Sequence, residues 1–291
     1  MKKTTIAPNE CSTKRWLAVL AVGVIGGLIL TAPLSPLLEN RTDSFMGIAF
    51  ADLFGVLSFI PLFVCLVLAV RFVGKTSFQD FVLGVGGKVR MKDCLLVLGL
   101  YGAGFAVSCL LTLKNIRLRQ VDGGQFSFLV LFMLLTAWMQ TTWEELVYRG
   151  VFLRWACKNQ VGFTKKALLA AAVSSVVFAL SHITNPEVTS QSGIRVAMMM
   201  ISYAIPGFVS FLANLHFGNL LPGILIHWLN NFTLFTLIST ENSAVPVPTL
   251  LIDGTPNSAL WSLSSTVIAY LPVVVYLLAA GAKKRKSAAI R

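Results

Sequence analysis

The sequence predicts an all-α fold, a polytopic transmembrane bundle of about eight helices. An ordinary soluble globule is excluded, because 56% of the 291 residues are hydrophobic and only 12% are charged, against about a quarter charged in soluble domains. The mean hydropathy of +0.76 agrees with this. The apolar residues form long runs without the short alternation of barrel strands. We therefore expect a single integral membrane domain over residues 1–291.

Each predicted helix is an apolar run close to the roughly 20 residues that cross the hydrocarbon core of a bilayer. A spanning segment must satisfy its backbone hydrogen bonds internally, so runs of this length are predicted to be helices. The runs lie at residues 16–34, 45–70, 93–113, 126–146, 165–183, 194–214, 218–238 and 259–280.

The net charge of +12 follows membrane topology and does not indicate nucleic-acid binding. Most Lys and Arg residues fall in four groups that eight spans would bring to one side, at residues 2–15, 71–92, 154–166 and 283–291. Basic residues are enriched on the cytoplasmic side of membrane proteins. The sequence therefore predicts a multi-pass protein of the cell membrane with both termini in the cytoplasm and the lipid bilayer as its surroundings.

The stretch TTWEELVYRG, at the end of the fourth run, carries charge into an otherwise apolar segment. Glu145 and Arg149 are four residues apart, so on a helix they can form an ion pair. Glu144 points about 100° away on the helix, outside this ion pair, and is therefore a candidate catalytic residue. The alternative is a helix end with solvated charges, but charged residues within membrane segments are usually functional.

Two further apolar runs carry polar side chains at helical spacing. VFALSHITN places Phe178 and His182 four residues apart, and GILIHWLNN does the same for His227 and Asn231. Either pattern can also be a structural hydrogen bond between helices. Glu144 and His182 differ by only about one turn, roughly 6 Å, in their distance from the turn expected near residue 161. We expect the four polar side chains to meet in the inner half of the bilayer, provided that the fourth helix extends beyond the lipid or tilts strongly.

A carboxylate and an imidazole can deprotonate a water molecule by general-base catalysis. A second imidazole with an amide can supply donors to a developing oxyanion. Neither GxSxG nor HExxH occurs in the sequence. The pattern therefore predicts hydrolysis of an acyl compound, with a peptide bond as the favoured substrate and water as the nucleophile.

In their order, EExxxR (Glu144, Glu145, Arg149), FxxxH (Phe178, His182) and HxxxN (His227, Asn231) resemble the CPBP, or Abi, family of CAAX-processing intramembrane endopeptidases and bacteriocin-protection proteins. The resemblance covers a core of about residues 126–240. It implies an eight-helix core that opens to the cytosol and a protease of membrane-associated peptides or proteins, in CAAX-type or bacteriocin-like processing. It also implies that Glu144 and His182 hold the water, while His227 and Asn231 bind the oxyanion. Glu145, Arg149 and Phe178 are expected to support the site.

Two questions stay open at this stage. Glu144, His182 and His227 are candidate ligands of a catalytic zinc ion, although a metal-free glutamate mechanism uses the same residues and is slightly favoured. The alternative functions are a non-catalytic immunity protein that binds a toxic peptide and a proton-coupled transporter. The sequence contains no repeated half or paired broken helices of the kind that transporters show.

Overall fold

The computed structural model describes residues 13–34, 45–84, 89–156, 163–240, 249–254 and 258–289. Within these ranges each of the eight predicted runs forms a long helix, and eight helices have seven residues or more. They are α1 (Thr13–Thr31), α3 (Phe45–Leu68), α5 (Met91–Leu111), α6 (Gly123–Glu145), α8 (Lys165–Leu180), α10 (Ile194–Phe217), α11 (Leu221–Thr236) and α12 (Ser258–Ala289). The predicted helical membrane fold is confirmed.

Five helices of the described part are long and apolar enough to cross a membrane. They cover Lys14–Thr31, Met91–Leu111, Gly123–Ala156, Ile194–Phe217 and Ala259–Gly281. Large apolar side chains such as Leu110, Leu131 and Leu278 are more than half exposed on the outside of the bundle. An apolar exterior of this kind suits contact with lipid tails. With five such helices, the chain is a multi-pass membrane protein.

The fourth helix runs well beyond the predicted end at residue 146. α6 passes into a π-helical turn, Leu146–Gly150, and then into α7 (Val151–Ala156), so that one apolar helix spans 34 residues. Its start is capped by Asp122, whose carboxylate accepts a hydrogen bond from the backbone of Gln125 at 2.9 Å. A longer fourth helix was one of the two conditions, beside a strong tilt, for bringing Glu144 to the level of the other polar side chains. The turn expected near residue 161 lies outside the described residues.

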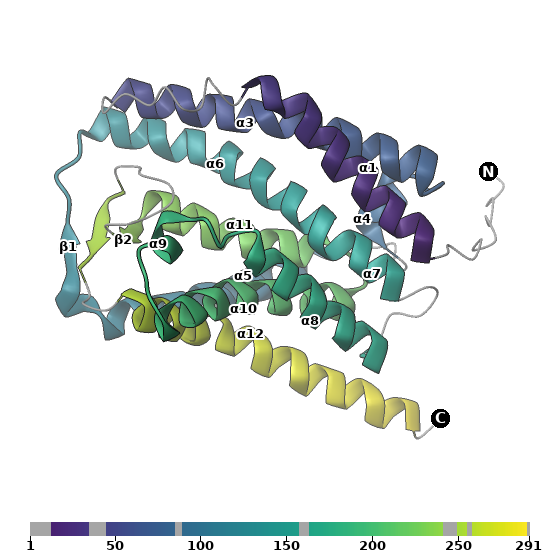
Figure 1. Ribbon diagram of the computed structural model, residues 1–291. Coiled ribbons are helices and arrows are strands. Elements are labelled where there is room, and N and C mark those ends of the chain that lie inside the picture. The colour runs from purple at the N-terminus through teal and green to yellow at the C-terminus, as the bar shows by residue number, and fades with distance from the viewer. Residues whose placement is uncertain are drawn as a thin grey trace.

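The helices form one bundle with their ends gathered at two poles (Figure 1). α7, the start of α1 and the end of α12 lie at one pole, to the right in the view. At the other pole is a three-stranded sheet that an all-α prediction does not include. β1 (Ile116–Leu118), β3 (Leu251–Asp253) and β2 (Ile238–Thr240) lie in that order, with β1 antiparallel and β2 parallel to β3. Short helices α4 (Phe78–Leu83) and α9 (Pro186–Thr189), two 3-10 turns (Ala32–Leu34 and Leu113–Asn115) and a π-helical turn (Ala69–Val73) complete the secondary structure of the described chain.

Candidate active site

The π-helical turn at the end of α6 separates Glu144 and Glu145 from α7. A π-turn leaves backbone groups of a helix without their usual partners, and such turns are frequent at functional sites. Here the side-chain hydroxyl of Ser174 on α8 donates to the backbone carbonyl of Tyr148. This bond connects the irregular part of the fourth helix to its neighbour. It therefore holds the turn against α8.

The predicted ion pair between Glu145 and Arg149 is present. Both side chains are fully buried, and Nη1 of Arg149 lies 3.4 Å from Oε1 of Glu145. Nε of Arg149 donates to the backbone carbonyl of Gly207 on α10 at 3.4 Å. A Cβ atom at position 207 would come within 2.7 Å of Nη2 of Arg149. The close approach of α10 to the guanidinium therefore requires a glycine, which the sequence patterns did not single out.

The ring of Phe178 lies among the charged and aromatic groups of the site. The guanidinium carbon of Arg149 lies 4.2 Å from its centroid, a cation–π contact. The imidazole of His182 lies 4.6 Å from the same ring, and that of His227 lies 5.5 Å away at nearly a right angle. Phe178 thus contacts residues of all three sequence motifs.

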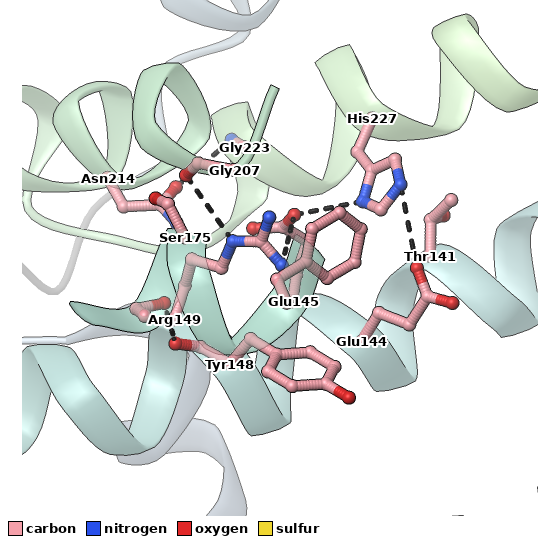
Figure 2. Close-up of polar contacts among 12 residues, drawn as sticks. Thr141, Glu144, Glu145, Tyr148, Arg149, Ser175, Gly207, Asn214, Gly223 and His227 are labelled. Atoms are coloured by element: carbon pink, nitrogen blue, oxygen red, sulfur yellow. Dashed lines mark hydrogen bonds and ion pairs between the residues drawn. The ribbon is translucent and has the colours of Figure 1, made fainter. Parts of the chain in front are cut away.

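His227 lies between the two carboxylates (Figure 2). Its Nδ1 is 2.9 Å from Oε1 of Glu145, and its Nε2 is 3.5 Å from Oε2 of Glu144. A carboxylate only accepts hydrogen bonds, so Nδ1–H donates to Glu145 and Nε2 faces Glu144. From the sequence, Glu145 is expected to pair with Arg149 alone. In the structure the same oxygen of Glu145 also orients the imidazole.

Glu144 has a more open environment than its neighbour. The residue is 8% exposed, and its Oε1 accepts a hydrogen bond from the side-chain amide of Gln140 at 3.1 Å. Its Oε2 has no hydrogen-bond partner among the described residues. Glu144 therefore keeps one carboxylate oxygen beside Nε2 of His227 for a further ligand or proton.

His182 lies beyond the end of its helix. α8 ends at Leu180, and His182 lies in the turn that follows, whereas the sequence predicted a helix through residue 183. Its Nδ1 is 2.9 Å from the backbone carbonyl of Phe178, which can only accept. In the neutral ring Nε2 is therefore the acceptor nitrogen. No hydrogen bond or ion pair joins His182 to Glu144 in the described part of the chain, so their joint hold on a water molecule stays a prediction.

A polar network that the sequence patterns missed supports the ring of His182. Tyr203 on α10 stacks on the imidazole, with ring centroids 4.6 Å apart. The hydroxyl of Tyr203 donates to the carboxylate of Glu187 and accepts from Nδ2 of Asn185 at 2.9 Å. This network holds the stacked tyrosine and thereby limits how far His182 can turn.

Asn231 lies one turn after His227 on α11, as predicted. The residue is 9% exposed, and its Oδ1 accepts a hydrogen bond from the side-chain amide of Asn230 at 3.1 Å. The start of α11 is held by the fully buried Asn214, whose Oδ1 accepts from the backbone N–H of Gly223 at 3.0 Å. This side-chain cap fixes α11 against α10 about one turn before His227.

The residues present do not form a metal site of the predicted composition. No group of three His, Cys, Asp or Glu residues in the described part of the chain is arranged to hold a metal ion. Of the three candidate ligands, Glu144 and His227 are adjacent. The third, His182, turns its Nδ1 to a backbone carbonyl and lies against Tyr203. The predicted His₂Glu ligand set is therefore not assembled.

Together the fold and this cluster define a class, a multi-pass helical membrane protein with a buried glutamate–histidine–arginine site. Residues 126–233 match the family model of the type II CAAX prenyl endopeptidases, described as Rce1-like. This part of the chain is a domain of that family, as the resemblance of its motifs predicted. Comparison with curated proteins and with solved structures gives no match.

Proposed function

We propose that this protein is an intramembrane endopeptidase that hydrolyses a peptide bond in a membrane-associated peptide or protein. The observation that supports this best is the imidazole of His227, held between Glu144 and Glu145 inside the endopeptidase domain. Glu145 is fully buried and paired with Arg149, whereas Glu144 is slightly exposed and holds its Oε2 beside Nε2 of His227. This arrangement suits general-base chemistry.

In the proposed reaction Glu144 is the general base. Its Oε2 takes a proton from a water molecule as the water oxygen bonds to the carbonyl carbon of the substrate. The tetrahedral intermediate collapses with cleavage of the C–N bond, and the proton passes to the leaving amine. His182, whose Nε2 is an acceptor in the neutral ring, is proposed as a second group that holds the water. No step of this reaction is routed through a metal ion.

His227 and Asn231 are proposed to stabilise the oxyanion. The hydrogen bond from Nδ1 of His227 to Glu145 orients the imidazole. The same carboxylate balances the positive charge of the ring when both nitrogens are protonated, and Nε2–H is then a charge-assisted donor. Donors that are already oriented stabilise a developing oxyanion strongly in a site that excludes water.

We infer that the site faces the cytoplasm of a cell with the protein in its plasma membrane. The basic pairs Lys14–Arg15 and Lys165–Lys166 stand at the starts of α1 and α8, and Arg154 is in α7. These segments share the pole at which α12 ends (Figure 1). An excess of Lys and Arg marks the cytoplasmic side. Single cysteines are placed in the two terminal segments of the protein, and intact cells are treated with a thiol reagent that does not cross the membrane. In the proposed orientation neither cysteine is labelled.

The identity of the substrate is the main test of the proposal. Membrane proteomes of cells that carry the wild-type protein or the Glu144→Gln variant at equal levels are compared for uncleaved peptides. We expect at least one membrane peptide to accumulate with the variant and to be cleaved by the purified wild-type protein. Identical proteomes, or immunity to a toxic peptide that Glu144→Gln leaves intact, would instead support the binding function.

The role of a metal is tested on the same cleavage reaction. Because the three candidate ligands do not converge, we expect cleavage to continue after treatment with a strong zinc chelator. Metal analysis of the purified protein accompanies the assay. Loss of activity on chelation, with recovery when Zn²⁺ is returned, would contradict the metal-free mechanism.

A further inference from the structure

A chain of hydrogen bonds connects α5 to the candidate oxyanion donor. The hydroxyl of Tyr101 donates to Oδ1 of Asn230 at 2.9 Å, and Nδ2 of Asn230 donates to Oδ1 of Asn231 at 3.1 Å. Tyr101 lies outside the part of the chain that matches the endopeptidase family. Neither Tyr101 nor Asn230 is one of the residues that the three sequence motifs specify.

The direction of this chain fixes which end of the Asn231 amide can act. An amide has one acceptor oxygen and one donor nitrogen on the same carbon. Because Oδ1 of Asn231 accepts from Asn230, the amide is turned so that Nδ2 points away from that bond. Nδ2 is the end that can donate to an oxyanion. The opposite orientation would present a carbonyl oxygen and repel negative charge.

Tyr101 is held firmly enough to set this direction. It is 1% exposed, and its ring lies 5.0 Å from that of Tyr270 on α12 in an edge-on contact. On its own helix it stacks with Phe105, at a centroid distance of 6.2 Å. The hydroxyl of a buried tyrosine usually has a hydrogen-bond partner, and for Tyr101 that partner is Asn230. The position of α5 against α12 thus determines where the first donor of the chain lies.

We propose that Tyr101 and Asn230 are positioning residues that orient the Asn231 amide for oxyanion stabilisation. This inference rests on the proposed peptidase function and extends it to a residue outside the endopeptidase domain. Neither Tyr101 nor Asn230 contacts the substrate in this scheme. Without the hydroxyl of Tyr101, the Asn230 amide is free to turn over, and it then no longer holds Asn231 in the donating orientation.

The test compares two tyrosines at the same helix contact. Tyr101→Phe removes the first donor of the chain, and Tyr270→Phe removes a buried hydroxyl that has no hydrogen-bond partner among the described residues. The probe is an internally quenched peptide with a farnesylated CAAX sequence, in detergent micelles. We expect Tyr101→Phe to lower kcat about three- to tenfold, in the range for one neutral hydrogen bond. KM should stay the same, and Tyr270→Phe should leave both constants unchanged.

A double-mutant cycle shows whether Tyr101 acts through Asn231. If it does, adding Tyr101→Phe to Asn231→Ala lowers kcat no further, because the group that it orients is already gone. Additive losses, or an unchanged kcat for Tyr101→Phe alone, would overturn the proposal.

Failure of the peptidase function would be visible separately, as equal rates for the wild-type protein and Glu144→Gln. In that case the hydrogen-bond chain is tested by measuring the thermal unfolding of the wild-type protein, the two single variants and the double variant. Non-additive shifts in Tm would support the chain, while additive shifts would contradict it.

Discussion

Glu144 and Glu145 are neighbours in the sequence but belong to two different regions of the molecule. Glu145 faces the interior and is fully buried. It is bonded to Arg149 and His227, and the ring of Phe178 packs against the guanidinium of Arg149. Glu144 faces a less enclosed region, where it is 8% exposed and its carboxylate contacts the neutral amide of Gln140 and Nε2 of His227.

This difference separates structural support from chemistry on one helix. A buried charge is tolerated only when it is paired, and breaking such a pair is costly. Glu145 and Arg149 meet that condition together, so each depends on the other. The Glu144 carboxylate contacts the amide of Gln140 and the imidazole of His227, and His227 keeps Glu145 as a partner when Glu144 is replaced. Substitutions on the Glu145 side should therefore change stability first, and substitutions on the Glu144 side should change activity first.

The largest expected effect comes from Glu144→Gln. The variant keeps the size of the side chain but removes the base, so kcat should fall by about 10²–10⁴, the usual contribution of general-base catalysis. The Tm in detergent should remain within a few degrees of the wild-type value. The matched control is Glu145→Gln, which should lower Tm because it leaves the charge of Arg149 unpaired. Equal losses of Tm in the two variants would remove the distinction between the two regions.

Arg149→Ala tests the interior region directly. Its removal leaves the buried carboxylate of Glu145 without a cation, which should cost about 3–5 kcal/mol of folding free energy. Reversible unfolding in detergent and the amount of folded protein in the membrane measure this cost. The double variant Glu145→Ala/Arg149→Ala should lose less than the single variant, because no charge is stranded. A stable, fully active Arg149→Ala protein would be incompatible with the pair as described.

Asn231→Ala is expected to affect the transition state alone. Removal of one oxyanion donor typically costs about 2.7–4 kcal/mol, or roughly 10²–10³ in kcat. KM should change little, because the ground-state substrate does not carry the negative charge. The kinetic constants of the purified protein separate the two effects. A raised KM with an unchanged kcat would make Asn231 a substrate anchor instead.

The smallest expected effect is that of Gly207→Ala. The added Cβ would lie 2.7 Å from Nη2 of Arg149, in a place where the guanidinium cannot move freely. Overpacking of this kind costs about 1–3 kcal/mol, and the better helix propensity of alanine offsets part of it. We expect a lower Tm with kcat nearly unchanged. A suitable control is Gly102→Ala on α5, where a Cβ would meet nothing within 4 Å.

Much of the fold could be predicted because its signals are local. The length and polarity of a segment decide whether it can cross a membrane, and all eight runs are helical in the structure. The ion pair of Glu145 and Arg149 was predictable for the same reason, since one helix sets the spacing of both. The end of α8 before His182 was not, because the apolar run continues past the last helical residue, Leu180.

The sequence by itself determined the membrane class, the three motifs and which charges share a helix face. Only the tertiary structure decided that His227 lies between two carboxylates, one of which is 82 residues away in the chain. It also decided that Phe178 contacts His182 and His227. The close approach of Gly207 to Arg149 and the hydrogen bond from Tyr101 to Asn230 depend on the tertiary structure too. Helical periodicity specifies the face on which a side chain lies. The partner that it meets depends on how the helices rotate, cross and slide against one another when they pack, and many residues together set that geometry.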